Sequence, residues 1–530
     1  MAAGKPHVVM AVANPVTMDA RVRKTAISVQ AMGYRVTLLW AGPTRGEVIE
    51  EDLEGVRTIG LPVPYHLRVR AAQVEAKRAA LRPRPLNLGY RDAQARRLRA
   101  AELAAWRART GTIRQPLTLR WAELVHRFRS KILSASVGAH QRRYESHQRR
   151  YKERRLARPW RRELAEVADL DGIFTPWMIE LAPDILHLHD IHLLSAGVNA
   201  KRYLAARGAA PKLIYDAHEY VRGMIGQNPF REAGFTGLER ELITQADSVV
   251  TVSEPIADRL RQDLGLAVRP TVVLNSPPLA AGARASDGAA GQDGDGAQDS
   301  DGTQDKHGAA ASGKDSHDAA GACASSVKAP SIRSTIGLPD DRPLAVYSGV
   351  LHANRRLSAL VDGFSLLDGV DLALVCVPNT RYSVPQELNR LAAEKGMADR
   401  FHLVEPVAPE QVVRFLSSAT LGVHPMALGL PNHEMALPNK LFDYIWAGLP
   451  VAVSQVAAMS ELVGEAGIGA TFDPDEPASI AAAVRLVLDN HAQMAAAARS
   501  PRLRQRFSWE AQMVKLEAVY QSLCPVTGTD

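Results

Sequence analysis

Cysteine is scarce in this 530-residue chain, and the positions of the cysteines argue against both disulfide bonds and a cysteine-ligated metal site. The three cysteines, Cys323, Cys376 and Cys524, are odd in number and far apart, so they predict neither a disulfide framework nor a standard zinc site. No run of about 20 apolar residues is present, so no membrane-spanning helix is expected. The beginning of the chain lacks the long apolar segment of a secretion signal. We therefore expect a cytoplasmic protein.

Glycine-rich dinucleotide-binding loops are also missing. The segments that follow the first strand pattern of each half read ANPVTMDAR and SGVLHANRR. Neither contains the G-x-G-x-x-G fingerprint, in which glycines allow the backbone to approach a pyrophosphate. A nicotinamide-dependent dehydrogenase is therefore not expected.

Two stretches of alternating strand and helix patterns predict the fold class. Short runs rich in Val, Ile and Leu, such as HVVMAVA, DILHLHD and PLAVYSG, alternate with amphipathic segments. Strands that are apolar on both faces and alternate with helices indicate a parallel sheet covered on both sides. The sequence predicts an α/β protein with two doubly wound, Rossmann-like domains, residues 1–278 and 334–500, and a C-terminal helix over 501–530. A ligand site is expected in the cleft that the two domains face.

The two predicted domains are joined by a segment of very different composition. Residues 279–333 are dominated by Gly, Ala, Asp and Ser and contain no aromatic residue. Such a segment buries too little apolar surface to offset the entropy of ordering. We expect a disordered, low-complexity linker.

Residues 66–165 interrupt the first domain with a strongly basic segment. They contain 27 lysines and arginines against 7 aspartates and glutamates, a local net charge of +20, whereas the rest of the chain carries −13. The Arg-rich helical patterns also contain Trp106, Trp121, Phe128 and Trp160. Basic amphipathic helices with aromatic anchors fit an anionic membrane surface, here the inner face of the plasma membrane. The alternative is a helical hairpin packed on the first domain with a solvated arginine face.

Nucleic acid is the other anionic partner that such a charge attracts. Charge alone gives non-specific binding, and the sequence contains no helix-turn-helix, zinc-finger, RRM or KH signature. We therefore expect no nucleic-acid partner.

Several local patterns, in a fixed order, resemble one protein family. They are DARVRKTAISVQAMGYRVTLL, DILHLHD, YDAHE, QADSVVTVSEPIADRL, YSGVLHANRR and PNKLFDYIWAGLPV. The set is similar to the GT-B fold of nucleotide-sugar glycosyltransferases, and most similar to the retaining enzymes of glycosyltransferase family 4. The resemblance covers residues 7–64, 180–278 and 335–522. It implies a nucleotide-sugar donor, which binds to the second domain.

The segment PNKLFDYIWAGLPV predicts a helix whose polar face lies at a donor site. Pro438 and Gly448 suit the limits of this helix, and Asn439 and Asp443 share one face, with Lys440 beside them. Free N–H groups and the positive dipole end at a helix start attract phosphate. By the resemblance, Asp443 holds the ribose hydroxyls of the donor. The alternative is an Asp443–Lys440 ion pair on a solvated helix face.

One acidic position of the family pattern is not filled. The family has a glutamate eight positions before the residue that matches Asp443, and Met435 stands there in this chain. Glu434 is one residue away and would serve only with a shifted loop. The contact with the transferred sugar that the resemblance implies is therefore in question.

The loop SGVLHANRR carries the expected diphosphate contacts. Gly349 follows a strand and lets the backbone approach a ligand. Arg355 falls where the family places a cation on the donor diphosphate, and the adjacent Arg356 leaves the register open. By the resemblance, the second cation position of the family falls at Val350, and Lys440 is a candidate to substitute for it. A fixed cation stabilises the charge that builds on the leaving diphosphate, so no metal and no other cofactor are expected.

Strand ends of the first domain supply the remaining candidates. By the resemblance, His189 at the end of DILHLHD contacts the transferred sugar, so His189, Asp190 and Arg355 are the catalytic candidates. The acceptor-side or cleft candidates are Asp19, Arg21, Asp216, His218 and Glu219. Helix capping is an alternative role for Asp19 and for Asp216. The spacing of the neighbouring histidines, His187, His189, His192 and His218, matches no standard zinc motif.

These patterns together predict a retaining glycosyltransferase. It would move a sugar from a nucleotide sugar to a glycan or lipid-linked acceptor in the synthesis of cell-envelope polysaccharide or glycoconjugate. Two alternatives are a nucleotide-sugar epimerase of related fold, which needs no acceptor, and a catalytically silent GT-B binding module, which binds donor without releasing sugar.

Overall fold

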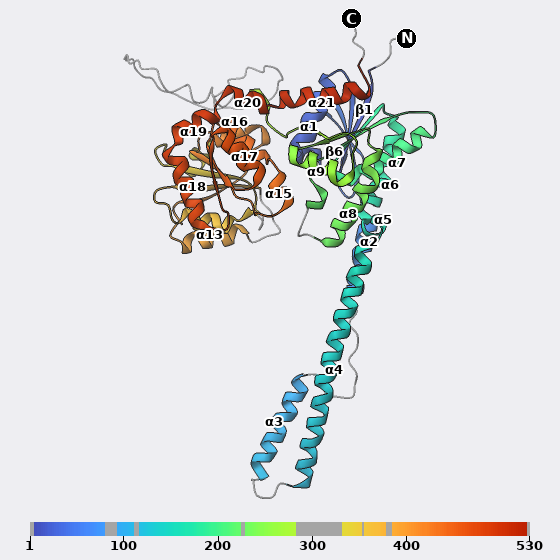
Figure 1. Ribbon diagram of the computed structural model, residues 1–530, viewed down its shortest axis with the longest axis vertical. Helices are drawn as coiled ribbons and strands as arrows, with labels where there is room; N and C mark the ends of the chain where they lie inside the picture. Colours follow the sequence, from blue (N-terminus) through green and yellow to red (C-terminus); the bar gives the residue numbers. More distant parts are fainter. Residues whose placement is uncertain are drawn as a thin grey trace, which may run out of the picture.

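The computed structural model describes residues 5–79, 93–110, 116–223, 228–281, 331–351, 355–377 and 384–526. Two α/β domains lie side by side, and a long helical arm extends away from the first (Figure 1). Most of the expected linker, residues 282–330, lies outside the described part of the chain. The predicted fold class is confirmed.

The first domain is built on an eight-stranded sheet with the order β3-β4-β2-β1-β5-β6-β7-β8. Its strands are β1 (His7–Val12), β2 (Arg35–Ala41), β3 (Ile49–Leu53), β4 (Val56–Leu61), β5 (Ile185–His189), β6 (Lys212–Ala217), β7 (Ser248–Thr251) and β8 (Thr271–Val272). All pair in parallel except β3 with β4. The edge strand β3 was not expected from its sequence, IEEDL, because three adjacent acidic residues look like a loop.

Helices cover both faces of this sheet, as the apolar strands require. One face packs on α6 (Ala165–Leu181), α7 (Leu194–Ala205) and α8 (Pro229–Leu242). The other packs on α1 (Ala20–Ala31) and on α21 (Trp509–Leu523), the last helix of the chain. The C-terminal helix therefore returns from the second domain to the core of the first (Figure 1). A single helix was expected over residues 501–530, but the structure has two helices there. Ser508 follows the end of α20 (Pro501–Phe507) and caps the start of α21.

The second domain has a parallel six-stranded sheet with the order β11-β10-β9-β12-β13-β14. Its strands are β9 (Leu344–Val350), β10 (Asp371–Val377), β11 (Phe401–Val404), β12 (Leu421–His424), β13 (Val451–Ser454) and β14 (Gly469–Phe472). Its main helices are α12 (Leu357–Phe364), α13 (Val384–Glu394), α14 (Val412–Leu416), α15 (Pro431–Met435), α16 (Asn439–Trp446), α17 (Ala457–Ala466), α18 (Pro477–Asp489) and α19 (His491–Ala498). The strand order reverses between β9 and β12, where ligands bind in open α/β sheets.

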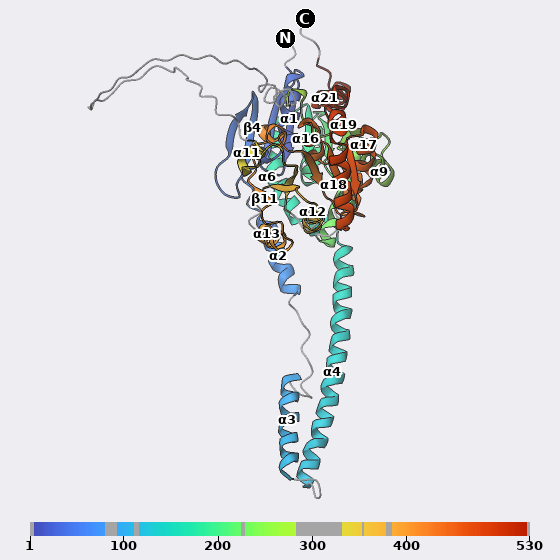
Figure 2. The same cartoon turned by 90° about the vertical axis from the view of Figure 1, so that its left-hand side faces the viewer.

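The basic segment between β4 and β5 forms a helical arm. Its helices are α2 (His66–Ala79), α3 (Ala93–Thr110), α4 (Leu117–Leu156) and α5 (Trp160–Glu163). The 40 residues of α4 correspond to about 60 Å at 1.5 Å per residue. The helix begins at the end furthest from the body, beside α3, and runs back to it (Figure 1 and Figure 2).

Ion pairs fix the arm at its base. Arg155, near the end of α4, pairs with Glu163 of α5 at 2.5 Å, and Arg158 pairs with Glu75 of α2 at 3.0 Å. The Arg155 guanidinium also lies 4.2 Å from the centre of the Phe230 ring in α8. Among the described residues, no helix combines the length and apolar character that a membrane crossing requires.

Candidate functional site

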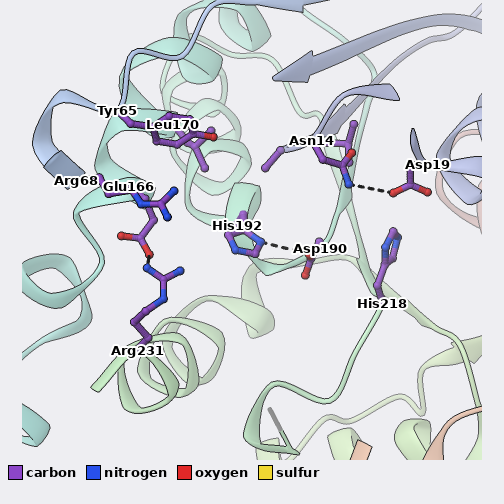
Figure 3. Close-up of a pocket in the computed structure, with 12 residues that line it drawn as sticks. Asn14, Asp19, Tyr65, Arg68, Glu166, Leu170, Asp190, His192, His218 and Arg231 are labelled. Atoms are coloured by element: carbon purple, nitrogen blue, oxygen red, sulfur yellow. Dashed lines mark hydrogen bonds and ion pairs between the residues drawn. The ribbon is translucent and has the colours of Figure 1, made fainter. Parts of the chain in front are cut away.

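A polar cavity of about 220 Å³ lies at the carboxyl ends of the first domain's strands. Asn14 and Asp19 border it after β1, Asp190 and His192 after β5, and His218 after β6 (Figure 3). Side chains from the base of the arm, α6 and α8 complete the wall: Tyr65, Arg68, Glu166, Leu170 and Arg231. The inserted segment therefore shapes the cavity, which its sequence did not predict.

Two of the predicted cleft residues form a buried ion pair. The Arg21 guanidinium donates to both carboxylate oxygens of Asp216, at 2.8 and 2.9 Å, and to the carbonyl oxygen of Val273 at 2.7 Å. Both side chains are almost fully buried, 3% and 2% exposed. Each of the three guanidinium nitrogens of Arg21 therefore already has a partner. This arrangement joins α1 to the end of β6 and gives Arg21 a structural role.

Asp216 is also the centre of a histidine cluster. His189 Nδ1 lies 3.3 Å and His218 Nε2 lies 3.5 Å from the carboxylate, and His187 stacks on His189. Burial works against the charge of Asp216, but Arg21 and the histidines hold its pKa well below the usual range. Burial lowers the pKa of His189, whereas Asp216 raises the pKa of His218 despite burial.

Only part of this cluster reaches the cavity. His189, expected to line the cleft, is fully buried, and His218 is the member of this cluster that borders the cavity. Donor atoms of His187, His189 and Asp216 lie within 4.8 Å of one another, as in a metal site. However, Arg21 occupies both oxygens of Asp216, and His187 Nδ1 lies 2.7 Å from the Tyr520 hydroxyl. These contacts fit an ion-paired network better than a metal centre.

Asp190 adopts an unusual backbone conformation at the cavity. Its φ is 68°, and its carboxylate accepts from the Ile191 N–H at 2.6 Å and lies 3.2 Å from His192 Nδ1. Burial opposes the charge, but the hydrogen bond with His192 and the nearby cations lower the pKa of Asp190 to about 2. A positive φ in a residue other than glycine costs of order 1–3 kcal/mol and often marks a functional position. The lowered pKa means that the Asp190 carboxylate is ionised beside the cavity.

Asp19 has the capping role that was its alternative. Its Oδ1 accepts from the Val22 N–H at 3.2 Å, which caps α1, and Oδ2 accepts from Asn14 at 3.3 Å. Glu219 is two residues beyond β6, and burial together with the charge of Asp190 raises its pKa. Arg355 of the second domain acts in the opposite direction on Glu219. The strand ends of the two domains thus lie close enough for their charges to interact.

The second domain presents unpaired polar groups at the strand end β9. Gly349 has φ 157°, and a Cβ there would lie 2.9 Å from the Tyr347 hydroxyl, so a side chain would be strained. Arg355 Nη1 is buried and has no hydrogen-bond partner among the described residues. Arg356, in contrast, pairs with Asp475 at 2.8 Å on the surface. The geometry therefore favours Arg355, not Arg356, as the ligand-binding cation.

Helix α16 carries the three predicted donor residues in its first two turns. Asn439 is exposed, and Lys440 Nζ lies 3.0 Å from Asp443 Oδ2, so the ion pair that was the alternative is present. Asp443 also lies where the two domains meet, because its charge acts on Lys24 of α1. Burial, with a smaller contribution from Arg21, lowers the pKa of Lys24 to about 8. The Asp443 side chain is 17% exposed, so it is partly buried but can still contact a ligand.

Met435, which occupies the position of the family's first glutamate, and its neighbours have structural roles. Met435 is buried and belongs to the apolar core of the first domain. Glu434 accepts hydrogen bonds from the N–H groups of Gly429 and Ala457, at 2.9 and 3.0 Å, and so caps α17. Asn432 accepts from the Tyr220 N–H at 3.1 Å. Helix α15 therefore docks on the first domain, and Glu434 is held in place as a cap.

His424 is a candidate that sequence reasoning missed. It ends β12, is 2% exposed, and neither ring nitrogen has a hydrogen-bond partner in the described structure. The ring stacks on Tyr347 with centroids 6.1 Å apart. Burial, reinforced by Arg355 and Lys440, lowers the pKa of His424 far below its usual value, so the ring is neutral. The available signal was its position as a strand-end histidine in LGVHPM, whereas His189 was selected by the resemblance.

Family profiles match both domains. Residues 121–276 match the family described as Glycosyltransferase Family 4, and residues 342–490 match Glycosyl transferases group 1. A D-inositol 3-phosphate glycosyltransferase from Geodermatophilus obscurus is 29% identical over 180 residues. That match covers 34% of this chain and 38% of the relative, so the similarity spans well under half of the relative's length.

Solved structures of the same fold cover nearly the whole chain. A sucrose-phosphate synthase from Thermosynechococcus elongatus superposes with a TM-score of 0.59 at 14% identity, covering 98% of this chain and 99% of that one. A glycosyltransferase from Rickettsia africae superposes with a TM-score of 0.53 at 10% identity, covering 99% and 100%. At these identities the likeness concerns the fold alone.

Proposed function

We propose that this chain, a GT-B protein of the glycosyltransferase family 4 type, transfers a sugar from a nucleotide sugar to a hydroxylated acceptor with retention of configuration. The observation that carries the proposal is the set of unpaired groups at the switch point of the second sheet. Arg355 Nη1 and both ring nitrogens of His424 are buried without partners among the described residues. Buried polar groups normally have partners, so their lack of one favours a ligand.

The donor diphosphate fits between β9 and α16. Gly349 allows the phosphates to approach the backbone, and the start of α16 presents free N–H groups and the positive end of its dipole. Arg355 would contact the diphosphate from the loop after β9. Asp443 would exchange part of its interaction with Lys440 for the two ribose hydroxyls, since a carboxylate accepts hydrogen bonds from both.

The reaction breaks the bond between the sugar anomeric carbon and the diphosphate oxygen. Negative charge therefore builds on the diphosphate as it leaves, and Arg355 and Lys440 are fixed cations that stabilise this charge. The acceptor oxygen forms the new bond to the anomeric carbon from the same face, and its proton passes to the departing diphosphate, so the configuration is retained. We propose that these two cations make a metal ion unnecessary.

The cavity of the first domain is the proposed acceptor site. It lies at the strand ends that face the second domain, and Asp190, held ionised, is placed to accept hydrogen bonds from acceptor hydroxyls. Its wall contains an ion pair of Arg231 with Glu166 and a contact of His192 with Asp190, which suit a polyol or glycan. Arg68 is a further cation at the wall that would attract an anionic group. The curated relatives are named for an inositol phosphate, which supports such an acceptor. A glycan or lipid-linked acceptor in envelope polysaccharide or glycoconjugate synthesis remains part of the proposal.

A location at an anionic membrane surface completes the proposal. The arm concentrates positive charge on one side of the first domain, and its base forms part of the acceptor cavity. Each basic residue near an anionic surface contributes on the order of 1 kcal/mol, so a fraction of the 27 in residues 66–165 would suffice.

Calorimetric titration with UDP, GDP and ADP, and with their sugars, tests the donor assignment. We expect one nucleotide series to bind, and Asp443→Ala to weaken its affinity about 10- to 100-fold, because a charged hydrogen bond contributes about 1.5–3 kcal/mol. Asp475→Ala, which removes a surface carboxylate paired with Arg356, is the control and should bind normally. Equal affinity in Asp443→Ala would remove the ribose role. Donor turnover that proceeds without any acceptor would favour an epimerase.

A further inference from the structure

We infer that the far end of α4 carries a surface that inserts into an anionic lipid bilayer. The surface, called here the distal stripe, consists of Leu117, Trp121, Leu124, Val125 and Phe128. These side chains are 82%, 67%, 56%, 37% and 66% exposed. The inference rests on the proposed function for its biological use, because it names the surface that would hold the enzyme near a membrane-linked acceptor.

The spacing of these residues places them on one face of the helix. Steps of four, three, one and three residues keep all five within an arc of about 100° at 3.6 residues per turn. The opposite side of α4 packs on α3, where Leu119 is 0% and Leu103 is 5% exposed. The distal stripe is therefore separate from the hairpin contact and is not covered by any described part of this chain.

Basic residues border the distal stripe. Arg120, Arg127 and Lys131 are exposed, and their positions on the helix place them along one edge of the apolar arc. The whole hairpin sequence, residues 93–132, contains ten lysines and arginines and two glutamates, with no aspartate. An apolar arc with Trp and Phe, edged by cations, is typical of helices that lie in the headgroup region of a bilayer.

The distal stripe could contact a second copy of the chain, a nucleic acid or a lipid bilayer, and the charge around it favours an anionic bilayer. A second copy would bring a hairpin of net charge +8 against another of +8, which opposes association. Nucleic acid would satisfy the cations but leave the apolar side chains exposed. An anionic bilayer satisfies both, since headgroups attract the arginines while acyl chains receive the Trp and Phe side chains.

The position of the distal stripe separates it from the candidate active site. The first turns of α4 lie at the end of the arm furthest from both domains, about 60 Å of helix from its base (Figure 2). Substitutions there should change membrane binding without changing the cavity or the donor groups. Binding and transfer can therefore be tested independently on the full chain.

Co-flotation of the full chain with vesicles tests the inference. We expect flotation with vesicles rich in phosphatidylglycerol and none with phosphatidylcholine alone. The double variant Trp121→Ser, Phe128→Ser should lose at least tenfold in vesicle binding, whereas Leu98→Ser should bind normally. Leu98 is a matched control because it lies on α3, outside the distal stripe, and is 61% exposed. Circular dichroism of each variant checks that the helices remain folded.

Three results would overturn the inference. They are flotation of the folded double variant like the parent, equal binding of the parent to neutral and to anionic vesicles, and no vesicle binding by the parent. Light scattering that shows a parent dimer and a monomeric double variant would instead assign the stripe to a second copy. Turnover with a water-soluble acceptor separates the two proposals. Vesicle binding without any sugar transfer would support the membrane-binding role of the distal stripe and refute the proposed function. Sugar transfer without vesicle binding would support the proposed function and refute the role of the distal stripe.

Discussion

The substitution Asp216→Asn should destabilise the first domain more than any change of a surface carboxylate. It keeps the shape of the side chain but removes the charge that Arg21 faces across 2.8 Å. Arg21 is 3% exposed on its side chain, so water cannot replace the lost partner. Removal of one member of a buried ion pair costs about 3–5 kcal/mol, because the other charge stays buried and uncompensated.

This cost translates into a large change in thermal stability. For a domain of 150–250 residues, each kcal/mol lowers the melting temperature by about 2–4 °C, so we expect a fall of about 6–20 °C. Scanning calorimetry measures it, and urea unfolding gives the free energy directly. The control is Glu50→Gln, which breaks the Arg57 pair between side chains that are both 51% exposed. Exposed pairs of this kind contribute about 0–1 kcal/mol.

A second variant tests the reason for the effect. In Arg21→Met with Asp216→Leu both charges are gone, and an apolar pair of similar volume should recover most of the lost stability. The reasoning is refuted if Asp216→Asn costs no more than Glu50→Gln. It is also refuted if the double substitution is less stable than Asp216→Asn, since burial of an unpaired charge would then not be the cause.

Three further predictions concern single side chains. Arg355→Ala should lower kcat about 100- to 1000-fold with an unchanged melting temperature, whereas Arg356→Ala should stay within about twofold; equal effects in a turnover assay would contradict the assignment. His424→Phe keeps the stack on Tyr347 but removes the unpaired nitrogens, so thermal unfolding should show no loss of stability while kcat/KM for the donor falls about tenfold. Glu239 of α8 is 0% exposed, and burial raises its pKa from 4.5 to about 7. The folded protein therefore holds a proton that the unfolded chain has lost, and stability falls as the pH rises from 4.5 to 7. Glu239→Gln should therefore stabilise the protein by about 3 kcal/mol at pH 8 and by little near pH 5; urea unfolding with the same gain at both pH values would exclude this titration.

The sequence was sufficient for the layers of the fold but not for their edges. Strands such as HVVMAV are apolar on both faces, which only a covered parallel sheet explains. The edge strand IEEDL pairs with a neighbouring strand on one side, β4, and carries three acidic residues. Its composition therefore does not distinguish it from a turn. The return of α21 to the first domain depends on contacts such as Trp509 with Ser28, at 2.9 Å, and no local pattern specifies them.

The same limit explains why the candidate site was only partly predictable. Arg21 and Arg355 look alike in the sequence, since each follows a strand and stands near the start of the next helix. They differ in what lies opposite: the carboxylate of Asp216 meets Arg21 from 195 residues away, whereas Arg355 Nη1 is buried without a described partner. A local pattern identifies cations near a strand end but cannot show which of them the folded chain has already paired. Among the described residues at the strand ends of the second domain, Arg355 Nη1 and both nitrogens of the neutral His424 are unpaired, and these are the groups that we propose a substrate uses.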